Sequence, residues 1–182
     1  MRVCGPNSAG SVNVTGKVAL TADVALELDE LTPGKIGLVS QSGGMTGAFL
    51  TRAEGRKIGF SSIISTGNEM DLEASDYIEF FLEDPQTQVI AVFLEGFRNI
   101  PRFRQVADLA LEKGKPMVVL KIGRTEVGAK AAASHTGALT GSDDVYNAVF
   151  KQKGITRVYA QEDLIEVASL FSKSPPPKGR RI

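Results

Sequence analysis

Histidine and cysteine are nearly absent from this chain, which has one of each among its 182 residues. The single cysteine, Cys4, cannot form an intrachain disulfide, and this scarcity favours a reducing compartment, so we expect a cytoplasmic protein. The single histidine, His135, cannot supply the several imidazole ligands of a typical zinc centre. We therefore expect no metal site made by protein side chains.

The chain also lacks an excess of charge of either sign, because 21 Lys and Arg residues balance 21 Asp and Glu residues. Without a basic field there is little to attract a nucleic acid or an anionic membrane, so we expect neither as a partner. No apolar run approaches the roughly 18 residues that span a bilayer, and the first residues lack a signal-peptide pattern. The length and the 42% hydrophobic content predict one domain with its own core.

Short apolar runs alternate with amphipathic segments from residue 36 onward. This alternation is typical of parallel strands joined by crossover helices. Strands are expected at 36–40, 59–64, 89–94, 117–121 and 156–159, and helices at 44–54, 70–83, 101–113, from 143 onward, and 162–172. The pattern predicts an α/β fold, a doubly wound parallel sheet of about five strands with helices on both faces. Functional groups are then expected at the carboxyl ends of the strands.

The two ends of the chain differ in composition from this region. Residues 1–33 contain many Gly, Asn, Ser and Thr residues and run into a Thr32-Pro33-Gly34 turn, so we expect an edge or linker segment. Residues 174–179, Ser-Pro-Pro-Pro-Lys-Gly, form an extended stretch of the kind that separates domains. The composition therefore predicts one folded unit over residues 34–172, with a linker over 173–182.

A glycine-rich turn, Ser40-Gln41-Ser42-Gly43-Gly44, joins the first expected strand to a helix. Glycines permit a tight turn, and the free amides at a helix N-terminus attract phosphate and other anions. We therefore interpret Ser42, Gly43 and Gly44 as candidate phosphate ligands. The turn matches neither the dinucleotide-binding fingerprint nor the Walker motif, and an ordinary tight turn between a strand and a helix stays open as the alternative.

Three further loops carry residues with chemical potential. His135 lies among small residues, including Ser134 and Gly137, which leave room for a bulky group to reach the imidazole. Glu95 ends the third expected strand, where a carboxylate can accept the imidazole N–H and fix its tautomer. A surface histidine and a solvated carboxylate are the ordinary alternatives. The segment at 65–68, Ser-Thr-Gly-Asn, either shapes a pocket or only turns the chain.

Ser42, Glu95 and His135 also occur in the chain order of an α/β-hydrolase triad. The nucleophile elbow of that fold requires Gly at the position of Ser40, and five strands are few for it, so a serine hydrolase is the weaker alternative. Phosphoryl transfer onto His135 uses the same residues more naturally. The glycine turn would hold the phosphate, the imidazole would be the nucleophile, and Glu95 would orient it.

Several stretches of the sequence resemble one family of enzymes. They are GPNSAG at 5–10, PGKIGLVSQSGG at 33–44, the segments at 59–87 and 115–155, and the later DLIEVASL. These stretches are similar to the middle of acyl-CoA synthetases of the NDP-forming (ADP-forming) type, which are related to succinyl-CoA synthetase. The resemblance implies a flavodoxin-like, Rossmann-like domain of a ligase that converts a carboxylic acid, CoA and ATP into acyl-CoA, ADP and phosphate.

The resemblance also implies roles for individual residues. His135 matches the histidine that is transiently phosphorylated, and Glu95 matches the glutamate that steadies it. Ser42, Gly43 and Gly44 match the helix N-terminus that faces the phosphate, and Ser134 and Gly137 flank the phosphorylated ring. The residues placed in loops facing CoA or the substrate are Asn7, Ser8, Gly67 and Asn68. Many members have cysteine where Ser8 stands in this chain.

The remaining implications concern partners. Residues 1–33 resemble the end of a CoA-binding domain, and residues 173–182 resemble the linker into a further domain. We expect the CoA-binding domain and an ATP-grasp domain or subunit as partners in an oligomeric enzyme, with a small carboxylic acid as substrate. No cofactor is expected beyond the transient phosphate; CoA and ATP or ADP with Mg are substrates of the whole enzyme. The isolated fragment is expected to be inactive. A non-catalytic CoA-binding, nucleotide-binding or regulatory module of the same fold is the alternative.

Overall fold

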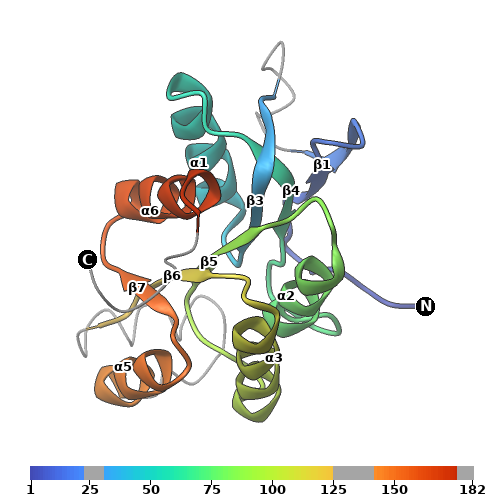
Figure 1. Cartoon of the computed structure of the whole chain (residues 1–182). Coiled ribbons are helices and arrows are strands. Elements are labelled where there is room, and N and C mark those ends of the chain that lie inside the picture. Colours follow the sequence, from blue (N-terminus) through green and yellow to red (C-terminus); the bar gives the residue numbers. More distant parts are fainter. Residues whose placement is uncertain (23–30, 125–141, 176–182) are drawn as a thin grey trace.

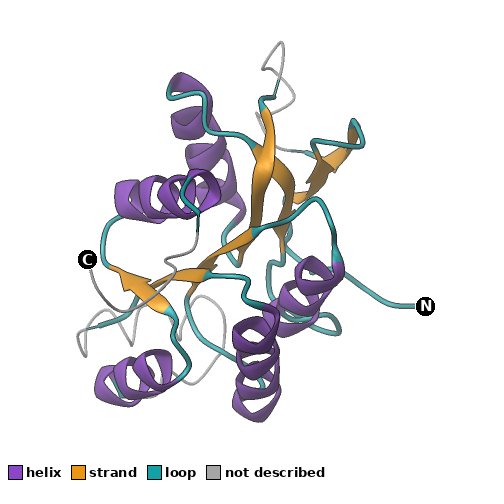
Figure 2. Cartoon of the chain, in the orientation of Figure 1, coloured by secondary structure: helices purple, strands orange, loops and turns teal. Residues whose placement is uncertain are grey.

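A computed structural model describes residues 1–22, 31–124 and 142–175 of the chain, whose strands form one twisted sheet (Figures 1 and 2). The strands lie in the order β2 (Val18–Thr21), β1 (Gly10–Asn13), β4 (Phe60–Ser65), β3 (Pro33–Ser40), β5 (Val89–Leu94), β6 (Met117–Lys121) and β7 (Thr156–Val158). The five strands from β4 to β7 in this order are parallel, whereas β1 is antiparallel to both β2 and β4. Numbered along the chain, the parallel strands have the order 2-1-3-4-5 of a flavodoxin-like sheet.

The predicted α/β fold is confirmed, but the described part of the sheet has seven strands rather than about five. The two additional strands, β1 and β2, form a hairpin from the segment that we expected to be an edge or linker. Few apolar side chains mark this hairpin: Val12 is buried, but Val18 and Leu20 are 52% and 73% exposed. Backbone pairing of β1 with β4 and burial of Val12 and Val14 in the apolar core hold the hairpin, and two buried side chains are too few for periodicity to predict it.

Two apolar clusters cover the two faces of the sheet. Helices α1 (Gly43–Gly55) and α6 (Gln161–Lys173) cover one face, and α2 (Ala74–Glu83), α3 (Ile100–Lys113) and α5 (Asp143–Gln152) cover the other (Figures 1 and 2). Neighbouring strand residues alternate between the clusters: Leu38 packs with Phe49 on the first face, and Val39 packs with Phe81 on the second. The central strands are buried on both sides, as parallel strands between helix layers must be.

The local sequence explains where α3 begins and ends. The Asn99 side chain accepts a hydrogen bond from the Arg102 amide at 3.0 Å, and Pro101 occupies the first turn. Gly114 ends the helix with φ of 64°, a left-handed conformation that glycine adopts without strain. The predicted helix at 101–113 is confirmed. The helix expected at 70–83 begins later, at Ala74, because the Met70 and Leu72 amides donate to carbonyls of the N-terminal segment.

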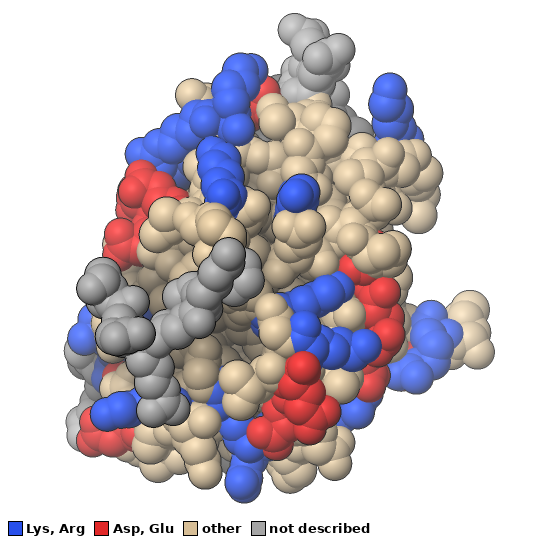
Figure 3. All heavy atoms as spheres, in the orientation of Figure 1, with Lys and Arg blue, Asp and Glu red and all other residues tan. Residues whose placement is uncertain are grey.

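Charged side chains of opposite sign lie beside one another on the surface in Figure 3. Arg52 of α1 pairs with Glu162, and Arg56, the C-cap residue of α1, pairs with Glu166, so two ion pairs connect this part of the chain to α6. Among the helices that the structure describes, none is both long enough and apolar enough to cross a membrane.

Candidate functional site

Successive parallel strands are added to the sheet in opposite directions on the two sides of the boundary between β3 and β5. The chain leaves β3 for β4 on one side, whereas the connection from β5 leads to β6 on the other side. The carboxyl ends of β3 and β5 are hydrogen-bonded neighbours, with Ser40 paired to Phe93. In an open α/β sheet this reversal creates the crevice where ligands bind. The expected location of the site at this edge therefore coincides with the loops that begin at Gln41 and Glu95.

The Gln41 side chain fastens these two loops together. Its Nε2 donates to the Gly96 carbonyl at 2.7 Å, and its Oε1 accepts from the amides of Glu95 at 2.6 Å and Gly96 at 3.1 Å. The Gln41 amide donates in turn to the Phe93 carbonyl. Both Gln41 and Glu95 are about 95% buried, at 6% and 5% exposure. The glycine-turn residues and Glu95 are thus held at one place in the fold.

Ser42 is the N-cap residue of α1, and its Oγ accepts from the Met45 amide at 3.4 Å. Gly43 and Gly44 are the first helical residues, whose amides have no acceptor within the helix. The first turn contains no acidic residue, so the positive end of the helix dipole is not offset there. A Cβ at Gly44 would meet no atom within 4 Å, which leaves the backbone open to a ligand.

The N-terminal loop and the loop after β4 are bonded to each other. The Ser8 Oγ donates to the Ser65 carbonyl at 2.6 Å, and the Asn7 Nδ2 donates to the Asn68 Oδ1 at 3.2 Å. Gly67 has φ of 60°, and a Cβ there would lie 2.3 Å from the Pro6 carbonyl oxygen. Only glycine therefore permits this approach, which brings the four predicted CoA-loop or substrate-loop residues together.

A cavity of about 640 Å³ joins the N-terminal loop to the start of α1. Its lining residues are Asn7, Ser8, Ala9, Ala22, Gln41, Ser42, Gly43, Gly44, Gly47, Ala48 and Thr51. The structure therefore brings the three glycine-turn residues and two of the predicted loop residues to one cavity. Gly67 and Asn68 support that loop without lining the cavity, and Glu95 lies buried beside it.

Glu69 is a buried carboxylate in this region that sequence reasoning missed. It is 4% exposed, and its Oε1 accepts from the Thr66 hydroxyl at 2.8 Å and from the Ala74 amide at 3.0 Å. Burial raises the pKa of Glu69, and hydrogen bonds from Thr66 and Gln41 offset part of this rise. The carboxylate thus ties the loop after β4 to α2. A single acidic residue in a polar loop provides no sequence signal for burial.

Replacing Glu69 with glutamine is expected to stabilise the chain in a pH-dependent way. Because burial raises the pKa of Glu69 in the folded state, the unfolded chain ionises first as the pH rises, and stability falls between the two pKa values. Each unit of pKa elevation corresponds to about 1.4 kcal/mol. Denaturant unfolding should show the advantage of Glu69→Gln at pH 7, and it should disappear below the unfolded pKa of about 4.3. A difference that is independent of pH would contradict this assignment.

His135, Ser134 and Gly137 lie outside the described residues. They belong to the segment that connects the carboxyl end of β6 to the start of α5. Within the described part of the chain, no group of three His, Cys, Asp or Glu residues is arranged to hold a metal ion.

Comparison with known proteins shows that this chain is similar to parts of CoA ligases. Residues 33–171 match the family described as succinyl-CoA ligase like flavodoxin domain. The chain is 41% identical over 182 residues to subunit alpha of acetate–CoA ligase (ADP-forming) I from Pyrococcus furiosus, covering 100% of the chain but 38% of that subunit. It is 41% identical over 180 residues to 4-hydroxybutyrate–CoA ligase (ADP-forming) from Nitrosopumilus maritimus, covering 97% of the chain and 25% of that protein.

A solved structure gives the same relation in three dimensions. The dinucleotide forming acetyl-coenzyme A synthetase 1 of Ca. Korarchaeum cryptofilum, in complex with phosphate and ADP, superposes with a TM-score of 0.88 at 39% identity. The match covers 98% of this chain and 38% of that chain. This chain therefore spans between a quarter and two fifths of the relatives that it matches.

Proposed function

The chain belongs to the family of succinyl-CoA ligase-like flavodoxin domains, and from this membership we propose that it carries a phosphohistidine within an ADP-forming acyl-CoA synthetase. The observation that carries the proposal is the Gln41 bridge, which holds Glu95 beside the open N-terminus of α1. An anion site and a carboxylate next to each other are what a phosphorylated imidazole requires. The names of the relatives, which are CoA ligases for acetate and 4-hydroxybutyrate, support a small carboxylic acid as substrate.

The proposed reaction has three displacements. The His135 imidazole attacks the γ-phosphorus of ATP, and ADP leaves. A carboxylate oxygen of the acid then attacks the phosphorus of phosphohistidine, which releases the imidazole and forms an acyl phosphate. The CoA thiolate attacks the acyl carbon, and phosphate leaves with the electrons of the broken C–O bond. In each step the amides of Gly43 and Gly44 offset phosphoryl charge, while Glu95 accepts the imidazole N–H.

Other domains must supply the remaining parts of this reaction. Because the chain spans only 38% of the P. furiosus subunit, we propose that a CoA-binding domain and an ATP-grasp domain or subunit act on it. The cavity that Asn7 and Ser8 share with Ser42–Gly44 is where the acyl and CoA groups would meet the phosphoryl group. Mg accompanies the nucleotide on the ATP-grasp side of the reaction.

The test is direct phosphorylation of the chain. We expect incubation with labelled ATP and the ATP-grasp domain of an ADP-forming acyl-CoA synthetase to add one acid-labile, base-stable phosphate. Glu95→Gln should slow the labelling by about 10- to 100-fold, because an amide oxygen holds the imidazole N–H less strongly than a carboxylate. Glu112→Gln, on the exposed side of α3, is the matched control and should not change the rate.

An unlabelled chain, in the presence of a partner shown to be active on its own substrate domain, would instead indicate the non-catalytic binding module.

The geometry does not favour the hydrolase alternative. Ser42 has φ of −102° and ψ of 121°, an ordinary extended conformation, whereas a hydrolase nucleophile lies on a strained elbow. A fluorophosphonate probe is therefore expected to leave Ser42 unlabelled.

A further inference from the structure

A second cavity, of about 540 Å³, lies at the carboxyl ends of β6 and β7. Its described lining residues are Leu120, Lys121, Ile122, Gly123, Arg124, Asp143 and Tyr159, none of which is among the described residues that line the cavity at α1. Because β6 is the neighbour of β5, the second cavity opens on the same edge of the sheet as Glu95. We call it the Lys121 cavity. The function proposed above uses none of its residues.

Lys121 is buried at the wall of this cavity, with 1% of its surface exposed. Its ammonium nitrogen donates to the Ile122 carbonyl at 2.7 Å and lies 4.6 Å from the centre of the Tyr146 ring. An ammonium has three N–H donors, and this is its one hydrogen bond within the described part of the chain. Burial lowers the pKa of Lys121, and the charge of Asp143 offsets part of this effect. A buried ammonium with uncommitted donors favours an anionic ligand.

Two arginines add positive charge around Tyr159. The guanidinium of Arg124 lies 4.5 Å from the centre of the Tyr159 ring, and that of Arg157 lies 5.2 Å from it. Arg157 is bound to Asp143 and Asn147, and its side chain is 5% exposed. Its buried Nε has no hydrogen-bond partner in the described part of the chain. The aromatic ring therefore positions two cations without neutralising either of them.

The charges of this group do not balance. Among the described residues that line the cavity, Lys121 and Arg124 are cationic and Asp143 is the one carboxylate. Asp143 is paired with Arg157, which lies behind the lining, so the four side chains together carry three positive charges and one negative charge. The group therefore carries an excess of two positive charges when Lys121 is protonated. A phosphoryl group, which carries nearly two negative charges at neutral pH, matches this excess and offers several acceptor oxygens.

We propose that the Lys121 cavity is a second anion site, which binds a phosphoryl group through the Lys121 ammonium and the Arg124 guanidinium. Tyr159 holds the guanidinium in place. The phosphoryl group can belong to inorganic phosphate, to a nucleotide or to CoA, and the shared chemistry is the doubly charged tetrahedral anion. This proposal does not depend on phosphorylation of His135, because it concerns reversible binding to residues outside the first cavity.

The test is titration of the ¹⁵N-labelled chain with sodium phosphate at neutral pH and constant ionic strength, followed by NMR. We expect saturable shifts of the amides of Ile122, Gly123 and Arg124, separate from any shifts at Gly43 and Gly44. Lys121→Met should weaken phosphate binding at these amides by about tenfold or more, because a charge-assisted hydrogen bond is lost. Parallel titrations with ADP and CoA identify which phosphoryl compound binds most tightly at the same amides.

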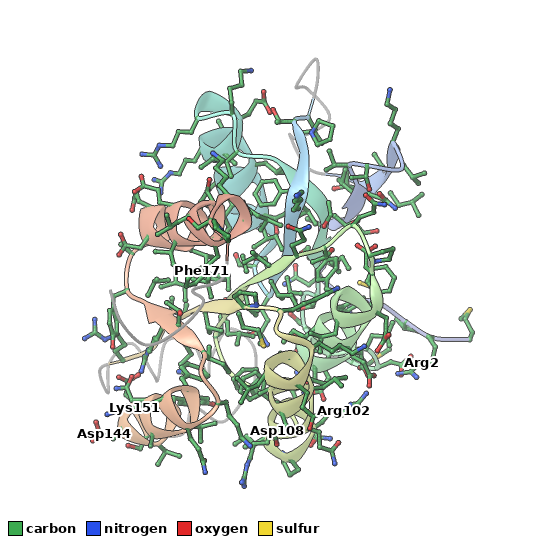
Figure 4. All side chains as sticks on the ribbon, in the orientation of Figure 1. Arg2, Arg102, Asp108, Asp144, Lys151 and Phe171 are labelled. Carbon is green, nitrogen blue, oxygen red and sulfur yellow. The ribbon has the colours of Figure 1, made fainter. Side chains whose placement is uncertain are left out.

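Two further variants keep the test decisive. Arg124→Gln changes an exposed side chain and should weaken binding without affecting folding. Lys151→Met removes an exposed charge from α5, at the periphery of the molecule, and should leave binding unchanged (Figure 4). The proposal is overturned if the phosphate-dependent shifts are confined to the α1 N-terminus. It is equally overturned if Arg124→Gln and Lys151→Met have the same effect, which would show general screening.

Discussion

Replacing His135 with alanine is expected to abolish labelling of the chain by ATP in the presence of an ATP-grasp partner. The chain contains one histidine, so the variant has no imidazole that could accept the phosphoryl group. Label on a hydroxyl group would be distinguished from label on an imidazole, because phosphate esters of hydroxyl groups are stable to acid and an imidazole phosphoramidate is not. The measurement is incorporation of acid-labile label, together with the mass increase of the intact chain.

A variant of similar polarity separates chemistry from folding. His135→Asn keeps a polar, hydrogen-bonding side chain but cannot form a phosphoramidate of comparable reactivity, so it should lose labelling as completely as alanine does. Denaturant unfolding of both variants at the wild-type midpoint would show that the loss of label is a loss of chemistry and not of folding. Undiminished label in His135→Ala would contradict the phosphohistidine. Sensitivity of that label to hydroxylamine would then assign it to a carboxylate.

The parallel sheet could be predicted from the sequence because its central strands are continuous apolar runs. Val89–Leu94 and Met117–Lys121 were predicted with the bounds that the structure has, since nearly every residue in them is apolar and all of them are buried. The α3 helix carries a Pro at its start and a Gly at its end. The β1–β2 hairpin has neither signal, because its place in the sheet depends on backbone hydrogen bonds to β4.

The candidate site was only partly accessible to the same reasoning. Ser42 and the two glycines form a local pattern, so their place at the start of α1 follows from neighbouring residues alone. The role of Gln41 depends on Glu95 and Gly96, more than 50 residues away, and becomes visible only when β3 and β5 are adjacent. The same holds for the contact of Asn7 with Asn68, whose partners are 61 positions apart. The roles assigned to His135 and Glu95 stay predictions.

The helix N-termini differ in whether acidic residues in the first turn offset the positive end of the helix dipole. Helices α2, α5 and α6 each have acidic residues in the first turn, among them Asp76, Asp143 and Glu162. Such residues stabilise a helix through its dipole by roughly 0.3–1 kcal/mol. The first turns of α1 and α3 have none, but the first turn of α3 carries Pro101 and Arg102, whereas that of α1 has two glycines, which are poor helix formers. The start of α1 is therefore less stable than it would be with an acidic first turn and no glycines. Its amides and the positive end of its dipole are available to an anionic ligand.

Replacing Gly44 with aspartate is therefore expected to act in opposite directions on stability and on phosphorylation. A Cβ at Gly44 would meet no atom within 4 Å, and an acidic residue in the first turn stabilises the helix. The same carboxylate would occupy the anion site and repel the incoming phosphoryl group. Two like charges about 4 Å apart repel by roughly 4 kcal/mol near a protein surface, so labelling of His135 should slow by roughly a hundredfold or more.

Gly44→Asn is the matched control for this substitution, because asparagine has nearly the same shape as aspartate and no charge. Both variants should unfold at a denaturant concentration equal to or above that of the wild type, since both replace glycine within a helix. If the anion site acts through charge, the asparagine variant should be labelled much faster than the aspartate variant, and raising the salt concentration should narrow the difference. Equal rates in the two variants would mean that steric access to the backbone, and not the field of α1, controls phosphoryl transfer at this site.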